Sequence, residues 1–195
     1  MKERVVLFDG KNLDAFTDQA TGERALWKVH DGVVTVTKHN IVSKYEYGDA
    51  HIHIEFCLPY MPEMTGQHRA NSGVYVQGCY EIQVLDSYGK EIPQKNDCGA
   101  VYEISAPLCN ACGKPEEWQV YDIYLRSARL GEKGEVKENA VLTVVLNGKV
   151  LHNNFSLPSN TPGGVYDHIV AEGPLMLQDH NCPVSFRNIW IQPLD

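Results

Sequence analysis

Residues 71–87 carry the sequence Asn71-Ser72-Gly73-Val74-Tyr75-Val76-Gln77-Gly78-Cys79-Tyr80-Glu81-Ile82-Gln83-Val84-Leu85-Asp86-Ser87. Two runs rich in β-branched and aromatic residues flank Gln77-Gly78, which predicts two central strands joined by a tight hairpin turn. Successive side chains on a strand point to opposite faces, so Glu81 and Gln83 share one face while Ile82 lies on the other. The hairpin therefore has an apolar face for a core and a second face with a carboxylate beside an amide.

The carboxylate of Glu81 is the first indication of function. Burying a carboxylate within a sheet costs several kcal/mol unless the group has a partner or faces a wet cleft. Asp86 follows at the end of the same strand, although strict alternation places it on the face opposite Glu81 unless a bulge intervenes. We therefore expect Glu81 to face a cleft.

Similar strand signals recur along the chain. Asp31-Gly32 and Asn147-Gly148 each separate two strand-like runs, and both dipeptides are favoured hairpin turns. Residues His51–Leu58 alternate between apolar and polar positions, and Cys98–Ile104 predicts a further short strand. About a dozen short strands with almost no helical periodicity predict an all-β fold, a two-sheet jelly-roll sandwich. We expect residues 1–195 to form a single domain.

The composition limits the classes of partner. The chain has 17 Lys and Arg residues against 25 Asp and Glu, a formal net charge of -8 and a pI of about 5.4. A negative protein repels polyanions, so nucleic acid is not an expected partner and a neutral ligand is favoured. The sequence contains no apolar run long enough to span a membrane and enters a strand-like segment at Val5 without an apolar leader. We expect a cytoplasmic protein, although a removed signal peptide would leave no trace.

Two groups of residues have spacings that could allow them to bind a metal ion. His51, His53 and Glu55 share one face of an alternating strand, but polar residues on the outer face of a half-buried strand explain this pattern as well. Cys109 and Cys112 have the spacing of a zinc or redox pair, without a second pair to complete a zinc site. We expect the six cysteines to be reduced, ordinary thiols.

A set of motifs in order along the chain resembles the 3-keto-disaccharide hydrolase domain family. The motifs are Leu7-Phe8-Asp9-Gly10-Lys11-Asn12-Leu13, Asn71–Tyr75, Tyr80–Ser87, Gly99–Tyr102, Gly173-Pro174, Leu177–His180 and Phe186–Ile189. The resemblance implies a sandwich of concanavalin-A-like lectin/glucanase type whose concave sheet holds carbohydrate, and an activity on glycosides oxidised at C3 of the sugar. The chain departs from the family pattern at Asn181, where glycine is expected, and at Glu117-Trp118-Gln119, where Gly-Glu-Trp-Asn is usual. These departures bear on substrate preference more than on fold.

The implied chemistry needs a base and an acid. A ketone at C3 acidifies the C2 proton, so the C1 group can leave after proton abstraction, with water adding afterwards. Such a route needs a general base near C2, a donor or metal at the enolate oxygen and an acid for the leaving group. We nominate Glu81 and His180 as the acid/base pair, because burial can adjust the pKa of each. The structural alternative is that Glu81 pairs with Arg187 and His180 caps a turn.

Other residues of the motifs are candidates for binding a small carbohydrate substrate. The expected substrate-binding residues are Asn71, Gln83, Asp86, Tyr102, Trp118, Gln178 and Arg187. A divalent metal ion could bind through Glu81, Asp86 or His180 and stabilise the enolate, yet the sequence shows no ligand set of recognisable spacing.

Two other functions remain open at this point. A retaining glucanase-like glycoside hydrolase needs two carboxyl groups about 5–5.5 Å apart. The register Glu81-Ile82-Gln83-Val84-Leu85-Asp86 departs from the Glu-x-Asp-x-x-Glu pattern of such relatives, since Gln83 removes the middle carboxylate. A non-catalytic, lectin-like carbohydrate-binding domain would need only the concave sheet, Trp118 and the amides.

Overall fold

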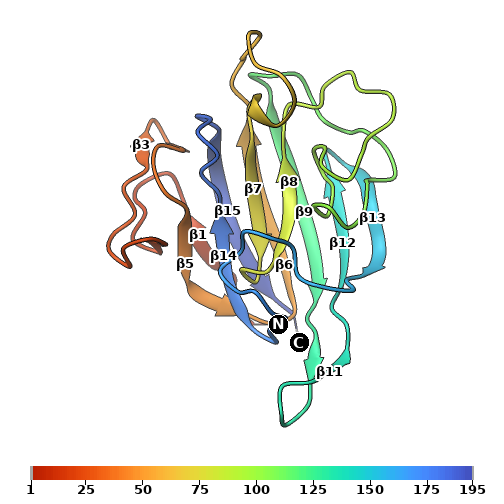
Figure 1. The fold of residues 1–195 in the computed structure, drawn as a ribbon. Helices are drawn as coiled ribbons and strands as arrows, with labels where there is room; N and C mark the ends of the chain where they lie inside the picture. Colours follow the sequence, from red (N-terminus) through yellow and green to blue (C-terminus); the bar gives the residue numbers. More distant parts are fainter. Residues whose placement is uncertain (1, 195) are drawn as a thin grey trace.

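The computed structural model describes residues 2–194, which form two β-sheets packed face to face (Figure 1). The strands of the larger sheet are β1 (Val5–Phe8), β3 (Lys28–His30), β4 (Val33–Thr35), β6 (Ala50–Cys57), β9 (Trp118–Arg126), β12 (Val141–Leu146), β13 (Lys149–Ser156) and β15 (Ser185–Pro193). The strands of the smaller sheet are β2 (Phe16–Asp18), β5 (Ile41–Tyr47), β7 (Ser72–Val76), β8 (Tyr80–Val84) and β14 (Gly173–Leu177). The remaining elements are the strand pair β10 (Arg129–Leu130) and β11 (Val136–Glu138), and a 3₁₀ turn, η1 (Gly66–His68). The expected all-β sandwich is confirmed.

The strand order brings distant parts of the sequence together. The larger sheet runs β13-β12-β9-β6-β15-β4-β3, with β1 paired to β15, and the smaller sheet runs β2-β5-β14-β7-β8. All strand pairings in the described part of the chain are antiparallel. Because β14 lies between β5 and β7, the residues that follow β14 come close to the β7–β8 hairpin.

The core is the layer between the two sheets. Strand β6 alternates as expected, because Ile52, Ile54 and Phe56 are fully buried and the residues between them are partly exposed. Ile82 and Val84 of β8 belong to the same apolar cluster from the other sheet. Burying each such side chain contributes about 1.5–3 kcal/mol, so the alternation on both sheets holds the sandwich together.

The β7–β8 hairpin forms as expected, with a connection longer than a two-residue turn. Residues 77–79 join the strands, so that Val76 pairs with Tyr80 and Tyr75 pairs with Glu81. Directly paired residues of an antiparallel ladder lie on the same face of the sheet. The observed register therefore places Tyr75 beside Glu81, on the face that points away from the core.

Strand β8 is the last strand of its sheet rather than a central one, which corrects the expectation. Its outer edge is nevertheless covered by residues 99–102. The amide of Gln83 donates to Ala100 O at 3.0 Å, the amide of Gly99 to Gln83 O at 2.9 Å, and the amide of Tyr102 to Glu81 O at 3.1 Å. Residues 98–104, expected as a strand, make only isolated bridges, and they bring Tyr102 next to Glu81.

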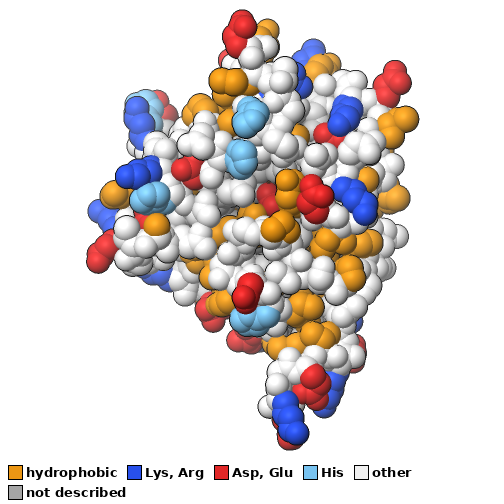
Figure 2. All heavy atoms as spheres, viewed as in Figure 1, with side chains coloured by type: hydrophobic (Ala, Val, Ile, Leu, Met, Phe, Trp, Pro, Cys, Tyr) orange, Lys and Arg blue, Asp and Glu red, His pale blue; other side chains and the backbone are white. Residues whose placement is uncertain are grey.

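The surface carries no extended region of one charge on the face that Figure 2 draws, where acidic and basic side chains are interspersed. The β10–β11 segment projects from the body of the sandwich (Figure 1). None of the described residues belongs to a helix that is long and apolar enough to cross a bilayer.

The cysteines are free thiols, all six of them within the described residues. Cys109 and Cys112 do not form a working pair. Cys112 is buried, and its contact with the Cys98 thiol, together with burial, raises its pKa. Since a raised pKa keeps a thiol protonated and unreactive, Cys112 is not expected to act as a redox or metal-binding thiolate.

Candidate active site

A cavity of about 180 Å³ lies on the outer face of the smaller sheet, over strands β7 and β8. It is closed at its sides by η1, by the segment after β8 and by the loop that precedes β14. The cavity brings together six of the residues expected from the sequence: Asn71, Glu81, Gln83, Tyr102, Gln178 and His180. The four further lining residues, Gln67, Tyr75, Pro162 and Gly163, were not expected.

Gly73 creates the space for the Glu81 carboxylate. The two residues lie on adjacent strands, and a Cβ atom built on Gly73 would lie 2.5 Å from Glu81 Oε1 and 3.1 Å from its carboxyl carbon. No other residue type leaves that space free. Glu81 is only 3% exposed, so its carboxylate sits in a slot that the missing side chain of Gly73 provides.

This slot gives a direct prediction for Gly73→Ala. The added methyl group should displace the Glu81 carboxylate, lowering the free energy of unfolding by about 1–3 kcal/mol, as overpacking does, and lowering turnover of any substrate that Glu81 acts on. Urea unfolding and steady-state kinetics measure the two effects. Gly48→Ala is the matched control, because a Cβ there meets no atom closer than 3.7 Å. Equal effects of Gly73→Ala and Gly48→Ala would contradict the interpretation that Gly73 leaves space for the Glu81 carboxylate.

Tyr75 holds the Glu81 carboxylate from the neighbouring strand. Its hydroxyl lies 2.8 Å from Glu81 Oε2 and 2.9 Å from Pro162 O, and it accepts a hydrogen bond from Gln178 Nε2 at 3.3 Å. A hydroxyl has a single proton to donate. When Glu81 is ionised, Tyr75 donates to it; when Glu81 is protonated, the carboxylic acid can donate to Tyr75, whose own proton then goes to Pro162 O.

Burial sets the proton affinity of this pair. Desolvation raises the pKa of Glu81 to about 7, and the hydrogen bond from Tyr75 opposes that rise. Burial, followed by the neighbouring Glu81 charge, also raises the pKa of Tyr75, so the phenol stays neutral. A carboxyl group with a pKa near neutrality can take up and release a proton under the same conditions, which is what acid/base catalysis requires.

Gln67 of η1 organises the amides of the cavity. Asn71 Nδ2 donates to Gln67 O at 2.8 Å and to its Oε1 at 3.1 Å, and Gln83 Nε2 donates to the same Oε1 at 3.1 Å. Gln67 Nε2 in turn donates to Asn96 O at 2.8 Å. The side chains of Gln67, Asn71 and Gln83 are therefore fixed relative to one another before any ligand arrives.

Two acceptors in the cavity have no partner. Asn71 Oδ1 and Gln178 Oε1 are buried and make no hydrogen bond within residues 2–194. A buried acceptor left without a donor costs about 1–3 kcal/mol, so these atoms favour a ligand that brings hydroxyl groups. A sugar has donors of this kind.

His180 reaches the cavity because the chain after β14 is anchored at Asp179. The amide of Asp179 donates to Asn40 Oδ1 at 2.8 Å, and Asp179 Oδ2 accepts from the amide of His39 at 3.0 Å. The residue after His180 is Asn181, which has a φ of 57°. This is a left-handed conformation that glycine adopts freely and asparagine tolerates best among the others. The departure from glycine at this position therefore keeps the backbone path that presents His180.

Two expected substrate contacts, Trp118 and Arg187, do not line the cavity. Both belong to strands of the larger sheet. The guanidinium of Arg187 lies 4.0 Å from the centroid of the Trp118 ring, and its Nε lies 2.6 Å from Glu55 Oε2. Arg187 therefore pairs with Glu55 and not with Glu81, which also removes the structural alternative for Glu81.

Asp86 is likewise displaced from the cavity. Its carboxylate lies 3.1 Å from Arg69 Nε and lines an adjoining cavity. The proposed divalent ligands Glu81, Asp86 and His180 do not converge, and no group of three or more His, Cys, Asp or Glu side chains in the described residues could hold a metal ion.

The histidines of β6 lie on the outer face of the larger sheet. Asp122 Oδ1 is 2.8 Å from His51 Nε2 and 2.9 Å from His53 Nδ1. The His53 ring stacks on Trp190 with centroids 4.7 Å apart. These residues form a hydrogen-bonded and stacked surface layer, in agreement with the interpretation as outward polar residues.

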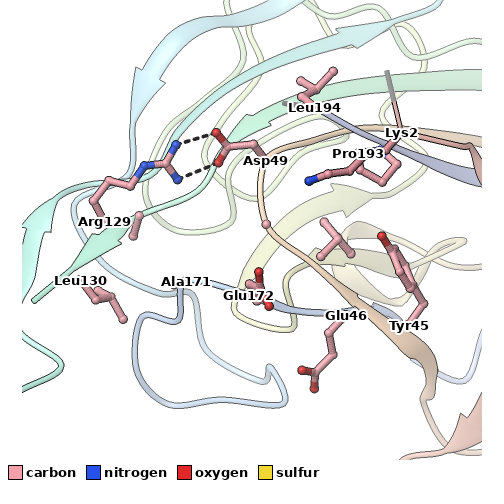
Figure 3. Close-up of a pocket in the computed structure, with 13 residues that line it drawn as sticks. Lys2, Tyr45, Glu46, Asp49, Arg129, Leu130, Ala171, Glu172, Pro193 and Leu194 are labelled. Atoms are coloured by element: carbon pink, nitrogen blue, oxygen red, sulfur yellow. Dashed lines mark hydrogen bonds and ion pairs between the residues drawn. The ribbon is translucent and has the colours of Figure 1, made fainter. Parts of the chain in front are cut away.

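A larger cavity of about 470 Å³ lies elsewhere, beside the turn between β5 and β6 (Figure 3). Arg129 closes one side through two contacts with Asp49, at 2.8 and 2.6 Å. Glu46 and Glu172 also line it. It contains none of the residues expected from the motifs, so its size alone does not make it the candidate active site.

Known proteins resemble this chain in sequence and in structure. The sequence profile described as the 3-keto-alpha-glucoside-1,2-lyase-like domain matches residues 3–192. The crystal structure of a candidate glycosyl hydrolase from Parabacteroides distasonis is 40% identical and superposes with a TM-score of 0.88, over 99% of this chain and 84% of that one. No curated protein sequence matches the chain.

More distant structures share the fold. A second candidate glycosyl hydrolase from Parabacteroides distasonis is 22% identical, with a TM-score of 0.74 over 98% of this chain and 94% of that one. The carbohydrate-binding module CBM66 from Bacillus subtilis is 10% identical, with a TM-score of 0.51 over 91% and 96%. Because the domain profile spans nearly the whole sequence and a 40% identical structure superposes along it, the chain belongs to the 3-keto-alpha-glucoside-1,2-lyase-like domain family.

Proposed function

We propose that this protein cleaves glycosides of 3-keto sugars by removing the proton at C2 and expelling the group at C1. The observation that carries the proposal is the position of Glu81. It is a buried carboxyl group whose pKa is raised to about 7. It faces a cavity lined by amide and phenol side chains, which suit a sugar, and His180 lines the same cavity. Family membership supports a carbohydrate as the substrate.

The reaction can be written with these two residues. The ionised Glu81 takes the proton from C2, and the electron pair of the C2–H bond forms the enolate of the C3 ketone. The enolate then expels the oxygen at C1, which takes a proton from His180, leaving a double bond between C1 and C2. Water then adds its oxygen to C1 and gives a proton to His180, while Glu81 returns its proton to C2, so the sum is hydrolysis of the glycosidic bond with the ketone unchanged and both residues restored.

The hydroxyl of Tyr102 is suited to donate a hydrogen bond to the enolate oxygen. Burial, followed by the charges of Glu103 and Glu81, raises the pKa of its hydroxyl, so the group remains a neutral donor. Its backbone is bonded to Glu81 O at 3.1 Å, which keeps the phenol beside the base. Preorganised donors at a developing negative charge are an effective source of catalysis.

The cavity disfavours ordinary retaining hydrolysis. That mechanism needs a second carboxyl group about 5–5.5 Å from the first. Among the described residues that line the cavity, Glu81 is the only carboxylate. Gln83 stands at the next position on the same face of β8 and is already engaged with Gln67.

The decisive experiment compares an oxidised substrate with its unoxidised parent. Purified protein, with and without chelator, is incubated with a 3-keto-disaccharide or with the parent disaccharide, and release of both halves is followed by chromatography. We expect cleavage of the 3-keto-disaccharide alone, because only the ketone acidifies C2. Cleavage of the parent alone would favour a glycoside hydrolase, and binding without turnover of either sugar would favour a lectin.

A further inference from the structure

A second cavity adjoins the candidate active site. It has a volume of about 390 Å³ and shares Gln67 with the active-site cavity. Leu85, which lines it, is the residue directly after β8, the strand that carries Glu81 and Gln83. With a rise of about 3.3 Å per residue, the distance along the strand from Glu81 to Leu85 is about 13 Å. The second cavity therefore adjoins the first at Gln67 and lies where the chain leaves β8.

The geometry points to this second cavity as the subsite for the leaving group, and to a second, uncharged sugar unit as its occupant. The inference rests on the proposed function. The active-site cavity, at about 180 Å³, is smaller than the roughly 300–1,000 Å³ typical of sites for drug-sized ligands. A disaccharide whose oxidised unit reaches Glu81 must place its other unit outside that cavity.

The charges of the second cavity are already paired. Arg69 Nε lies 3.1 Å from Asp86 Oδ2, and Lys90 Nζ lies 2.6 Å from Asp97 Oδ2. Both carboxylates are less than a tenth exposed. Such a lining offers donors and acceptors to hydroxyl groups without a net charge for an anionic ligand, which favours a neutral sugar over a uronate or a phosphate.

Tyr88 gives the second cavity an aromatic wall. It lines the cavity, and its side chain is 49% exposed although it is large and largely apolar. An exposed aromatic ring beside a polar pocket provides a flat apolar surface on which the C–H face of a sugar ring can pack. The loop that carries Tyr88 is held by a hydrogen bond, because the amide of Tyr88 donates to Asp86 Oδ1 at 3.2 Å.

A different cavity adjoins the active site at Pro162 and Gly163, which line both. It has a volume of about 470 Å³ and contains Tyr166. The wall toward it is backbone, and Pro162 O is 2.9 Å from the Tyr75 hydroxyl. The wall toward the second cavity is the partly exposed side chain of Gln67, which lines both cavities. The paired charges and the exposed ring of Tyr88 favour the second cavity, beyond Gln67, as the place of the leaving group.

The test measures kcat/KM for two substrates of the wild type and three variants. One substrate is a 3-keto-disaccharide and the other is the methyl glycoside of the same 3-keto sugar, which has no second ring. We expect Tyr88→Ala to lower the ratio of kcat/KM for the disaccharide to that for the methyl glycoside by roughly five- to tenfold. Tyr88→Phe keeps the ring and should retain the ratio, and Tyr166→Ala should leave it within about twofold. Thermal unfolding checks that each variant is folded.

The outcomes separate this inference from the proposed function. A fall in the ratio with Tyr166→Ala and not with Tyr88→Ala would place the leaving group in the other cavity and overturn the inference. If neither Tyr88→Ala nor Tyr166→Ala changes the ratio of the two kcat/KM values, the inferred subsite is also overturned. In that case the proposed function still stands, because the wild type cleaves both 3-keto substrates. If the wild type cleaves neither 3-keto substrate, the proposed function fails, and the subsite fails with it.

Discussion

Glu81→Gln is expected to lower kcat/KM for a 3-keto glycoside by about 10²–10⁴-fold, the contribution typical of a positioned general base. Glutamine has nearly the same shape, so it fills the slot beside Gly73 and keeps a contact with Tyr75, but it cannot take the C2 proton. Initial rates of leaving-group release measure the loss. Glu55→Gln is the matched control, because Glu55 is a carboxylate bonded to Arg187 on the other sheet. A wild-type rate in Glu81→Gln would contradict the assignment of the base.

The acid is tested with the same assay. If His180 protonates the leaving oxygen, His180→Ala should slow release of a simple alcohol much more than release of a nitrophenol, because a nitrophenolate leaves without a proton. Equal losses for the two leaving groups would show that His180 acts in binding rather than in proton transfer.

The free energy of unfolding of the wild type is expected to fall by about 3 kcal/mol relative to Glu81→Gln between pH 4.5 and 7. The ordinary pKa of a glutamate is 4.5, and burial raises that of Glu81 to about 7. In this window the folded protein keeps the proton and the unfolded chain releases it, so a rise in pH favours unfolding. A shift of about 2.5 units at 1.36 kcal/mol each gives the expected size. The stabilisation is complete below pH 4.5 and is lost above pH 7.

Urea unfolding of both proteins across pH 4 to 8 measures this difference. Tyr75→Phe provides a further check, because the hydrogen bond from Tyr75 lowers the pKa of Glu81 and its removal should extend the window to higher pH. Parallel curves for the wild type and Glu81→Gln would mean that the carboxyl group is not desolvated in the folded protein.

The recurring strand signals along the chain were enough to predict the sandwich, and the alternation of the β7–β8 hairpin was enough to predict the face on which Glu81 lies. It could not predict the partner of Glu81, since that depends on the register. A two-residue turn would have set Tyr75 opposite Tyr80, whereas the observed connection of residues 77–79 sets Tyr75 opposite Glu81. One additional residue in the turn changes which side chains meet across the two strands.

Other errors have a different cause. Period-two alternation shows which side of a strand a residue occupies, but not the sheet to which the strand belongs. For this reason Trp118 and Arg187 were expected at the cavity, although they lie on the larger sheet. Gln67 was missed because it lies in a Pro- and Gly-rich loop, where sequence periodicity carries no information. Six of the expected residues did converge, and these came from motifs on or directly after β7, β8 and β14 or the segment that covers β8.

The segment 99–102, which pairs with the last strand of the smaller sheet, has a consequence for association between molecules. A bare edge strand presents its unpaired amides and carbonyls to any other chain and is a common starting point for aggregation. Here those groups of Glu81 and Gln83 are already satisfied within the molecule. The edge of β8, the strand that carries Glu81, is thereby unavailable for pairing with another chain, so the candidate active site can stay open to water without an unpaired strand edge beside it.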